Sequence, residues 1–195
     1  MKIKPILVIL VLIGFESIAQ DDAKLEFRVG AGIATAPDII NQISISVTES
    51  IVAPDFKDLD VNGGIALQGN LSFFPKSRLG LGLDLVYDRS DLRFDFENPV
   101  DPEQTTRVTY TSLMGRLDFR YIKKGPFRMY SSLGAGITRG VAERTDDPTI
   151  PKDEMTGWAF HVSPLGFRIG GALGIWAELG FGYRGLVSGG ISYAW

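Results

Sequence analysis

Residues 79–87, Leu79-Gly80-Leu81-Gly82-Leu83-Asp84-Leu85-Val86-Tyr87, decide the fold, because large apolar residues alternate along them with mostly small or polar ones. Alternate side chains of a β-strand lie on opposite faces, so this stretch predicts a strand with one leucine-rich face and one face that carries Asp84. Its length also matches the roughly 9 to 11 residues with which a tilted strand crosses a bilayer. The stretch is therefore a candidate membrane strand.

The same alternation recurs along the chain and predicts seven further strands. They are expected at about residues 25–34, 65–73, 113–121, 127–138, 158–162, 169–181 and 186–195. The connections near Pro75, Gly125 and Pro164 are short, whereas those at 36–60, 90–106 and 140–155 are long. Outer-membrane barrels have short periplasmic turns and long external loops. We therefore expect an all-β protein, an eight-stranded antiparallel up-and-down transmembrane β-barrel.

The amino-terminal residues have the features of a cleaved signal peptide. Lys2 and Lys4 precede an apolar run at 6–15, which ends in Ser17-Ile18-Ala19. A basic start, a short apolar stretch and small residues near the cleavage point are typical of export signals. A retained membrane anchor is the alternative, but the apolar run is shorter than the ~20 residues of a spanning helix. We expect residues 1–19 to be removed and residues 20–195 to form one barrel domain.

Composition excludes several classes of protein. The chain has no cysteine, so a disulfide framework, a thiolate nucleophile and a lipoprotein acylation site are all excluded. Its formal net charge of −3 gives no indication of nucleic-acid binding. Its mean hydropathy of only +0.09 fits a barrel, where lipid-facing and lumen-facing residues alternate and cancel.

The polar faces of the expected strands carry charges of both signs, interleaved with glycines. The ion-pair network expected in the lumen comprises Glu26, Arg28, Asp84, Asp88, Arg116, Asp118, Arg120 and Glu178. Lys24 and Arg168 lie on the same parity. Balanced charge with small residues suits a narrow lumen in which ion pairs neutralise buried groups. The alternative is a soluble barrel with an apolar interior and these residues on its solvated outer face.

Aromatic residues gather toward both ends of the expected strands. At the short-turn end they are Phe73, Tyr121, Phe127, Phe167, Tyr193 and Trp195, and at the other end Tyr87, Tyr110, Trp158, Phe181 and Tyr183. Two aromatic girdles around a leucine-rich band are typical of membrane barrels.

The carboxyl end resembles the β-signal that the barrel-assembly machinery recognises on the last strand of outer-membrane proteins. The residues of the motif are Gly190, Tyr193 and Trp195. Together with residues 164–170 and 177–185, this end is similar to the Bacteroidota-type small outer-membrane β-barrel family. The resemblance covers most of the mature chain as a pattern and about the last 35 residues as sequence. It implies the fold and the cell outer membrane, and no specific activity.

Two connecting segments carry local patterns of their own. Ile40, Ile43, Val47 and Ile51 recur at helical spacing in the first long connection, although a strand at 43–47 is also possible. Residues Leu92, Phe94 and Phe96 have the opposite parity to 79–87. That change of parity predicts a bulge or turn near Ser90.

Few residues indicate catalysis. His161 and Ser163 have the H-x-S spacing of outer-membrane lipid A deacylases, but their parity directs them into the lumen at the short-turn end. The acidic group Asp146, Asp147, Asp153 and Glu154 lacks the spacing of a calcium loop and is expected to be a solvated loop. We expect no catalytic, cofactor or metal site.

Two classes of function remain at this stage. The first is a structural or interaction barrel of the cell envelope, as a subunit or accessory of a larger complex, and the alternative is a lipid A-modifying hydrolase. A diffusion pore is disfavoured, because side chains fill the lumen of an eight-stranded barrel. The expected partners are outer-membrane lipids and lipopolysaccharide, the assembly machinery and an envelope protein.

Overall fold

The computed structural model describes residues 24–40, 56–75, 78–96, 104–145 and 150–195, and these form a closed antiparallel barrel. The strands are β1 (Leu25–Ile33), β2 (Phe56–Asn62), β3 (Ala66–Phe73), β4 (Leu79–Phe96), β5 (Gln104–Lys124), β6 (Phe127–Arg144), β7 (Asp153–Gly170), β8 (Leu173–Gly182) and β9 (Val187–Ala194). Eight of them close the ring in the order β4-β3-β1-β9-β8-β7-β6-β5, because β5 pairs back onto β4. The expected all-β, eight-stranded barrel is confirmed.

The first and last strands close the barrel next to each other. Leu25 and Trp195 exchange two backbone hydrogen bonds of 3.0 Å, and the β1–β9 pairing then runs to Ile33 and Val187. Both ends of the described chain therefore lie at the short-turn end of the barrel.

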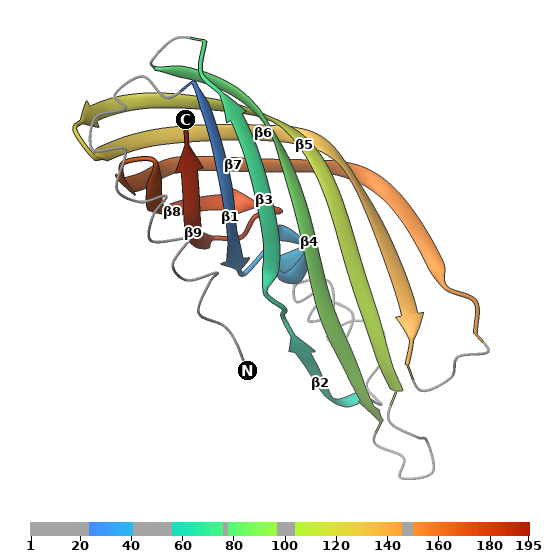
Figure 1. The fold of residues 1–195 in the computed structure, drawn as a ribbon. Coiled ribbons are helices and arrows are strands. Elements are labelled where there is room, and N and C mark those ends of the chain that lie inside the picture. Colours follow the sequence, from blue (N-terminus) through green and yellow to red (C-terminus); the bar gives the residue numbers. More distant parts are fainter. Residues whose placement is uncertain (1–23, 41–55, 76–77, 97–103, 146–149) are drawn as a thin grey trace, which may run out of the picture.

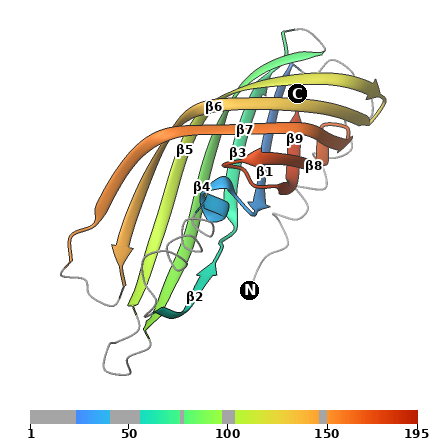
Figure 2. The same cartoon turned by 180° about the vertical axis from the view of Figure 1, so that it is seen from behind.

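Four strands are much longer than the others. Strands β4, β5, β6 and β7 contain 18 to 21 residues, whereas β1, β3, β8 and β9 contain 8 to 10. The long strands extend beyond the closed ring as a curved sheet on one side, and β2 pairs with the outer part of β4 (Figure 1). Seen from behind, the same four strands extend beyond the short ones toward the lower left of the view (Figure 2). We call this extension the projecting sheet.

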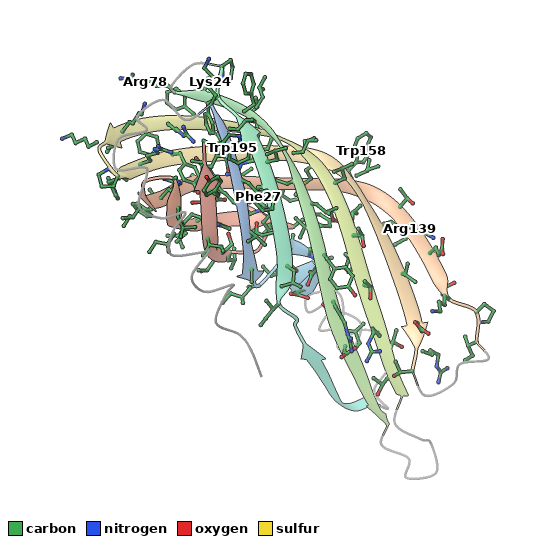
Figure 3. The ribbon with its side chains drawn as sticks, in the orientation of Figure 1. Lys24, Phe27, Arg78, Arg139, Trp158 and Trp195 are labelled. Carbon is green, nitrogen blue, oxygen red and sulfur yellow. The ribbon has the colours of Figure 1, made fainter. Side chains whose placement is uncertain are left out.

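The two faces of the strands have opposite chemistry. Along β4, the side chains of Leu79, Leu81, Leu83, Leu85 and Tyr87 are 44 to 57% exposed, whereas Asp84 between them is fully buried. The same parity holds around the ring, with an outer face of large apolar side chains (Figure 3) and an inner face rich in arginine and acidic residues. The described residues include no helix long and apolar enough to cross a membrane.

The expected end of the sixth strand at Pro164 is wrong. Strand β7 continues through Pro164 to Gly170, and the turn to β8 lies at 170–173. The pairing of β7 shifts register at this point, both against β6 between Tyr130 and Ser132 and against β8 between Val162 and Leu165. Proline has no N–H for the ladder, and a bulge is a place where a strand tolerates it.

The bulge expected near Ser90 is also absent from the described strand. The β4–β5 register is unbroken from Leu79↔Phe119 to Phe94↔Gln104. Leu92 simply faces inward, where it packs with Val108 and Tyr110 on the concave face of the projecting sheet. Tyr110, which was expected in the aromatic girdle at the long-loop end, therefore belongs to the inner face.

The first connection begins with a helical turn at 36–40, where a helix was one of the two expected forms. Thr35 caps it, since its carbonyl accepts from the Ile39 N–H at 3.0 Å and its hydroxyl accepts from the Asp38 N–H at 3.4 Å. Ala34, with φ of +55°, turns the chain from β1 into this cap. The remaining positions of the pattern, Ile43, Val47 and Ile51, lie outside the described residues.

Candidate functional site: the charged lumen

The lumen nearest the short turns is organised around Glu26 of β1. Its carboxylate accepts from Arg28 Nε at 2.6 Å and also pairs with Arg120 of β5. Arg128 Nη1 and Arg168 Nε each lie 3.5 Å from it. One buried carboxylate therefore joins arginines from β1, β5, β6 and β7.

The middle of the lumen holds a second group of ion pairs. Arg116 donates to Asp118 at 2.7 Å and to Glu178 at 2.7 Å. Arg28 reaches Glu178 at 3.2 Å, and its guanidinium lies 4.4 Å from the ring centre of Tyr130. Because Tyr130 also donates to Glu178 at 2.9 Å, the carboxylate of β8 is satisfied from three other strands.

Arg184 extends this group toward the loop end. It comes from the turn between β8 and β9, yet it is completely buried and pairs with Glu178 at 2.8 Å and with Asp84 at 3.5 Å. Asp84 also accepts from Asn70 at 2.8 Å and lies 3.5 Å from Arg116. The ion pairs therefore run without interruption from Glu26 to Asp84.

An apolar layer ends the network. Ala66, Val86, Met114 and Ala159 are buried together across the lumen, with Tyr183 packed against them. Val86 separates Asp84 from Asp88 on the inner face of β4, so Asp88 lies on the far side of this layer. There its carboxylate accepts from the Thr35 hydroxyl at 2.6 Å.

Seven of the eight residues expected in the lumenal network are therefore brought together, and Asp88 is not one of them. The structure adds three arginines that the expected network did not include: Arg128, Arg168 and Arg184. Arg168 has the inward parity of its strand, which is a usable signal. Arg184 lies in a tight connection, where strand parity gives no direction, and only the fold shows that it turns inward.

His161 and Ser163 face the lumen, as their parity indicates, but they do not form a catalytic pair. The Ser163 hydroxyl donates to the Leu179 carbonyl at 3.0 Å, and His161 Nδ1 accepts from the Arg184 backbone N–H at 3.3 Å. Both residues are fully buried. A nucleophile needs its base within hydrogen-bond reach and a route for substrate, and the described geometry supplies neither.

The residues of the carboxyl-terminal motif lie along the β1–β9 seam. Gly190 is opposite Gly30, and a Cβ at Gly190 would lie 2.1 Å from the Val29 carbonyl oxygen. Tyr193 and Trp195 face outward, with ring centres 5.5 Å apart. Gly190 therefore has a packing reason in the folded barrel, in addition to any part in recognition.

The acidic loop residues are only partly described. Glu154 forms an exposed ion pair of 2.7 Å with Arg139, while Asp146 and Asp147 lie outside the described residues. In the described parts of the chain, no three acidic, histidine or cysteine side chains gather into a group that could bind a metal.

Large side chains fill the lumen. Arg28, Arg168, Arg184, Tyr130, Met114 and His161 are each less than 2% exposed. An ion-paired interior of this kind holds strands together, because removing one partner leaves a buried charge without compensation. It is typical of a plugged barrel rather than of a diffusion channel.

Comparisons with known proteins identify no family for this chain. No protein-family profile matches the sequence, and no curated protein matches it. Among solved structures, the crystal structure of Ail, the attachment invasion locus protein of Yersinia pestis, aligns with 12% identity and a TM-score of 0.41, over 88% of this chain and 93% of that one. A likeness at this level assigns neither family nor function, so the functional argument rests on the barrel itself.

Proposed function

We propose that this chain is an integral barrel of the outer membrane, with a sealed lumen and a structural or interaction role in the cell envelope, and that it is not an enzyme. The observation that carries the proposal is that apolar and charged side chains are distributed in the reverse of the order found in a soluble protein. Large apolar side chains cover the outside, and charged side chains fill the inside. In water this arrangement would expose a continuous apolar surface far larger than a soluble monomer tolerates.

The outer face has the dimensions and the borders of a membrane belt. Strands β1, β3, β8 and β9 have 8 to 10 residues, close to the roughly 9 to 11 that cross a bilayer. Beyond Ile137 and Trp158, toward the long loops, the apolar outer face of β6 and β7 gives way to the exposed ion pair of Arg139 with Glu154. At the other end, Lys24 and Arg78 are exposed next to the short turns (Figure 3). Charge therefore borders the apolar band on both sides.

Export and assembly belong to the same proposal. Residues 1–19 act as the signal peptide, and Gly190, Tyr193 and Trp195 present the last strand to the barrel-assembly machinery. Membership of the Bacteroidota-type small barrel family is part of this proposal and rests on the sequence resemblance. The lipids that surround the belt are outer-membrane lipids and lipopolysaccharide.

The projecting sheet is the surface that we assign to protein partners. Its concave face carries Leu92, Val108 and Tyr110, and Met155 of β7 is 52% exposed next to them. Within the described residues, 153–159 of β7 pairs only with β6, since the Phe160 carbonyl accepts from the Tyr183 N–H and the β7–β8 pairing begins at His161↔Gly182. An apolar concave face beside an open strand edge is suited to hold another polypeptide segment.

The membrane part of the proposal is tested by cell fractionation and heat modifiability. The protein is expected in the outer-membrane fraction, and boiled and unboiled samples are expected to migrate differently on a semi-native gel. Recovery of the folded protein from the soluble periplasm contradicts the proposal.

The interaction part is tested with a photo-crosslinking amino acid placed at Met155 in whole cells. The matched control carries the same group at Ile169, which is 50% exposed in the apolar belt. Crosslinks to a protein are expected at 155 and not at 169. If neither position captures a protein, the chain acts without a partner on this face and the role is purely structural.

A further inference from the structure

Two carboxylates are buried together at the loop-end mouth of the barrel. Asp38 of the helical turn at 36–40 and Asp88 of β4 are each 1% exposed. Thr35 and Ser90, also fully buried, lie between them. The Thr35 hydroxyl donates to Asp88 Oδ2 at 2.6 Å, and the Ser90 hydroxyl donates to Asp38 Oδ1.

These hydrogen bonds join the helical turn at 36–40 to β4 in both directions. Thr35 accepts from the Asp38 backbone N–H at 3.4 Å, and Ser90 follows Asp88 by two residues on the same inner face of β4. The helical turn is thereby fastened to β4 at two points. Asp38 and Asp88 are held as neighbours by this connection.

One oxygen of each carboxylate is held by a hydroxyl, and the other is buried without a hydrogen-bond partner. The two remaining oxygens are Asp38 Oδ2 and Asp88 Oδ1. A buried ionised carboxylate is costly unless a cation or hydrogen-bond donors compensate it, and two of them also repel each other. A cation bound between the two free oxygens would relieve both costs, as would a proton shared by the two carboxylates.

The arginines of the lumen do not supply that charge. The lumenal ion pairs of the described residues end at Asp84, and Val86, Met114 and Ala66 form an apolar layer between Asp84 and Asp88. Arg89, the next residue on β4, faces outward and pairs with Asp91. Within the described residues, the apolar layer thus separates the two aspartates from the lumenal arginines that pair with Glu26, Glu178 and Asp84.

A neutral oxygen ligand is available near the same place. Gln68 of β3 lies on the inner face, opposite Val86, and its amide oxygen and nitrogen are both buried without a partner. Gln68 is the diagonal neighbour of Asp88 across β3 and β4, and a side chain as long as that of Gln68 can span this spacing.

We propose that Asp38 and Asp88 bind a hard divalent cation, with calcium preferred, at the mouth of the barrel. The free oxygens Asp38 Oδ2 and Asp88 Oδ1 are the charged ligands, Thr35 and Ser90 orient the two carboxylates, and Gln68 supplies a neutral oxygen. Carboxylate and amide oxygens are the ligands that Ca²⁺ takes, and its flexible coordination of 6 to 8 oxygens admits water at the remaining positions. The bound ion fastens the helical turn to β4. This inference does not depend on the proposed membrane location.

The test is calorimetric titration of calcium chloride and magnesium chloride into the purified full chain after treatment with a chelator, combined with thermal unfolding. For the wild type we expect one site and a calcium-dependent rise in Tm. Asp38→Asn and Asp88→Asn are each expected to weaken binding at least tenfold. Their Tm without metal should be equal to or above that of the wild type, because one of two repelling charges has been removed.

The matched control is Asp91→Asn, an acid of the same strand that faces outward and pairs with Arg107 at 2.8 Å. It is expected to leave calcium binding unchanged. Thr35→Val and Ser90→Ala keep both charges and are expected to weaken binding by a smaller factor, and they replace the aspartate variants if those do not fold.

Three results overturn the proposal. The first is a wild type without calcium or magnesium binding, which means that the carboxylates share a proton. The second is equal loss of binding in Asp91→Asn and Asp88→Asn. The third is an Asp88→Asn variant whose Tm without metal falls below that of the wild type while its calcium response persists, which assigns a structural role to the pair.

Discussion

Arg128 on β6 lies directly opposite Arg168 on β7, and both guanidinium groups come within 3.5 Å of the Glu26 carboxylate on β1. Like charges that face each other on neighbouring strands destabilise a sheet. Here a carboxylate from the other side of the lumen attracts both. Glu26 therefore connects strands that are not neighbours in the ring, and its removal should lower the stability of the whole barrel.

Glu26→Gln is expected to lower the free energy of unfolding by about 3 to 5 kcal/mol, because it leaves buried arginines without their shared partner. The control is Glu154→Gln, which removes an exposed ion pair with Arg139 and should cost about 1 kcal/mol or less. Urea titration of both variants folded in lipid vesicles measures the difference. Equal effects of the two substitutions would mean that water solvates Glu26 and that the lumen is open.

Alternation of residue types was sufficient to predict both faces of most strands. Leu83 and Asp84 are a clear example, since only one register places the leucine outside and the carboxylate inside. The same rule correctly directed Arg116 and Glu178 inward, although they lie 62 positions apart in sequence. Their contact itself was not predictable, because it depends on how the barrel closes.

Local signals failed where tertiary structure overrides them. Pro164 predicted the end of a strand, yet a bulge accommodates it within β7. Leu92 predicted a bulge, yet the strand continues unbroken because the projecting sheet has an apolar concave face. Strand β2 (Phe56–Asn62) begins inside the long connection expected at 36–60, because the alternation of Leu59 and Val61 with acidic residues is too short to predict a strand without its pairing with β4.

Gly190→Ala is expected to destabilise the barrel by about 1 to 3 kcal/mol, the usual cost of forcing extra atoms into a packed site. The added methyl group meets the Val29 carbonyl oxygen at the β1–β9 seam. Gly69→Ala on β3 is the control, because a Cβ there has no atom within 4 Å. Folding into vesicles without any assembly machinery measures the packing effect alone.

The same pair of variants separates packing from recognition. If Gly190→Ala folds in vesicles as well as Gly69→Ala but accumulates unassembled in cells, the glycine acts mainly in the carboxyl-terminal signal. Loss of folding in both settings assigns it to the seam.

His161→Ala is expected to leave the barrel folded and the lipid A of the cell unchanged. The substitution removes the acceptor of the Arg184 backbone N–H, and an unsatisfied buried donor costs about 1 to 3 kcal/mol. Mass spectrometry of lipid A from cells with the wild type, with the variant and without the protein is the measurement. An acyl chain that is missing only when His161 is present would restore the hydrolase alternative.

Arg116 and Leu117 are adjacent on β5 and test the assignment of the two faces. Arg116 is buried against Asp118, Glu178 and Asp84, whereas Leu117 is 46% exposed. Arg116→Leu leaves these carboxylates short of one partner and is expected to cost about 3 to 5 kcal/mol. Leu117→Arg places a charge in the apolar belt and is expected to cost about 2 to 4 kcal/mol near the bilayer midplane.

Because both substitutions destabilise, cysteine labelling is needed to tell the faces apart, and the absence of native cysteine makes each label unique. A membrane-restricted maleimide is expected to modify Leu117→Cys and not Arg116→Cys in folded barrels. A small water-soluble reagent should reach neither position until the barrel is unfolded, since position 117 is covered by lipid and position 116 by the ion-paired lumen. Labelling of 116 by the water-soluble reagent in folded protein, with no labelling of 117 by the membrane-restricted one, would invert the faces, and the chain would then be a soluble barrel with a solvated charged surface.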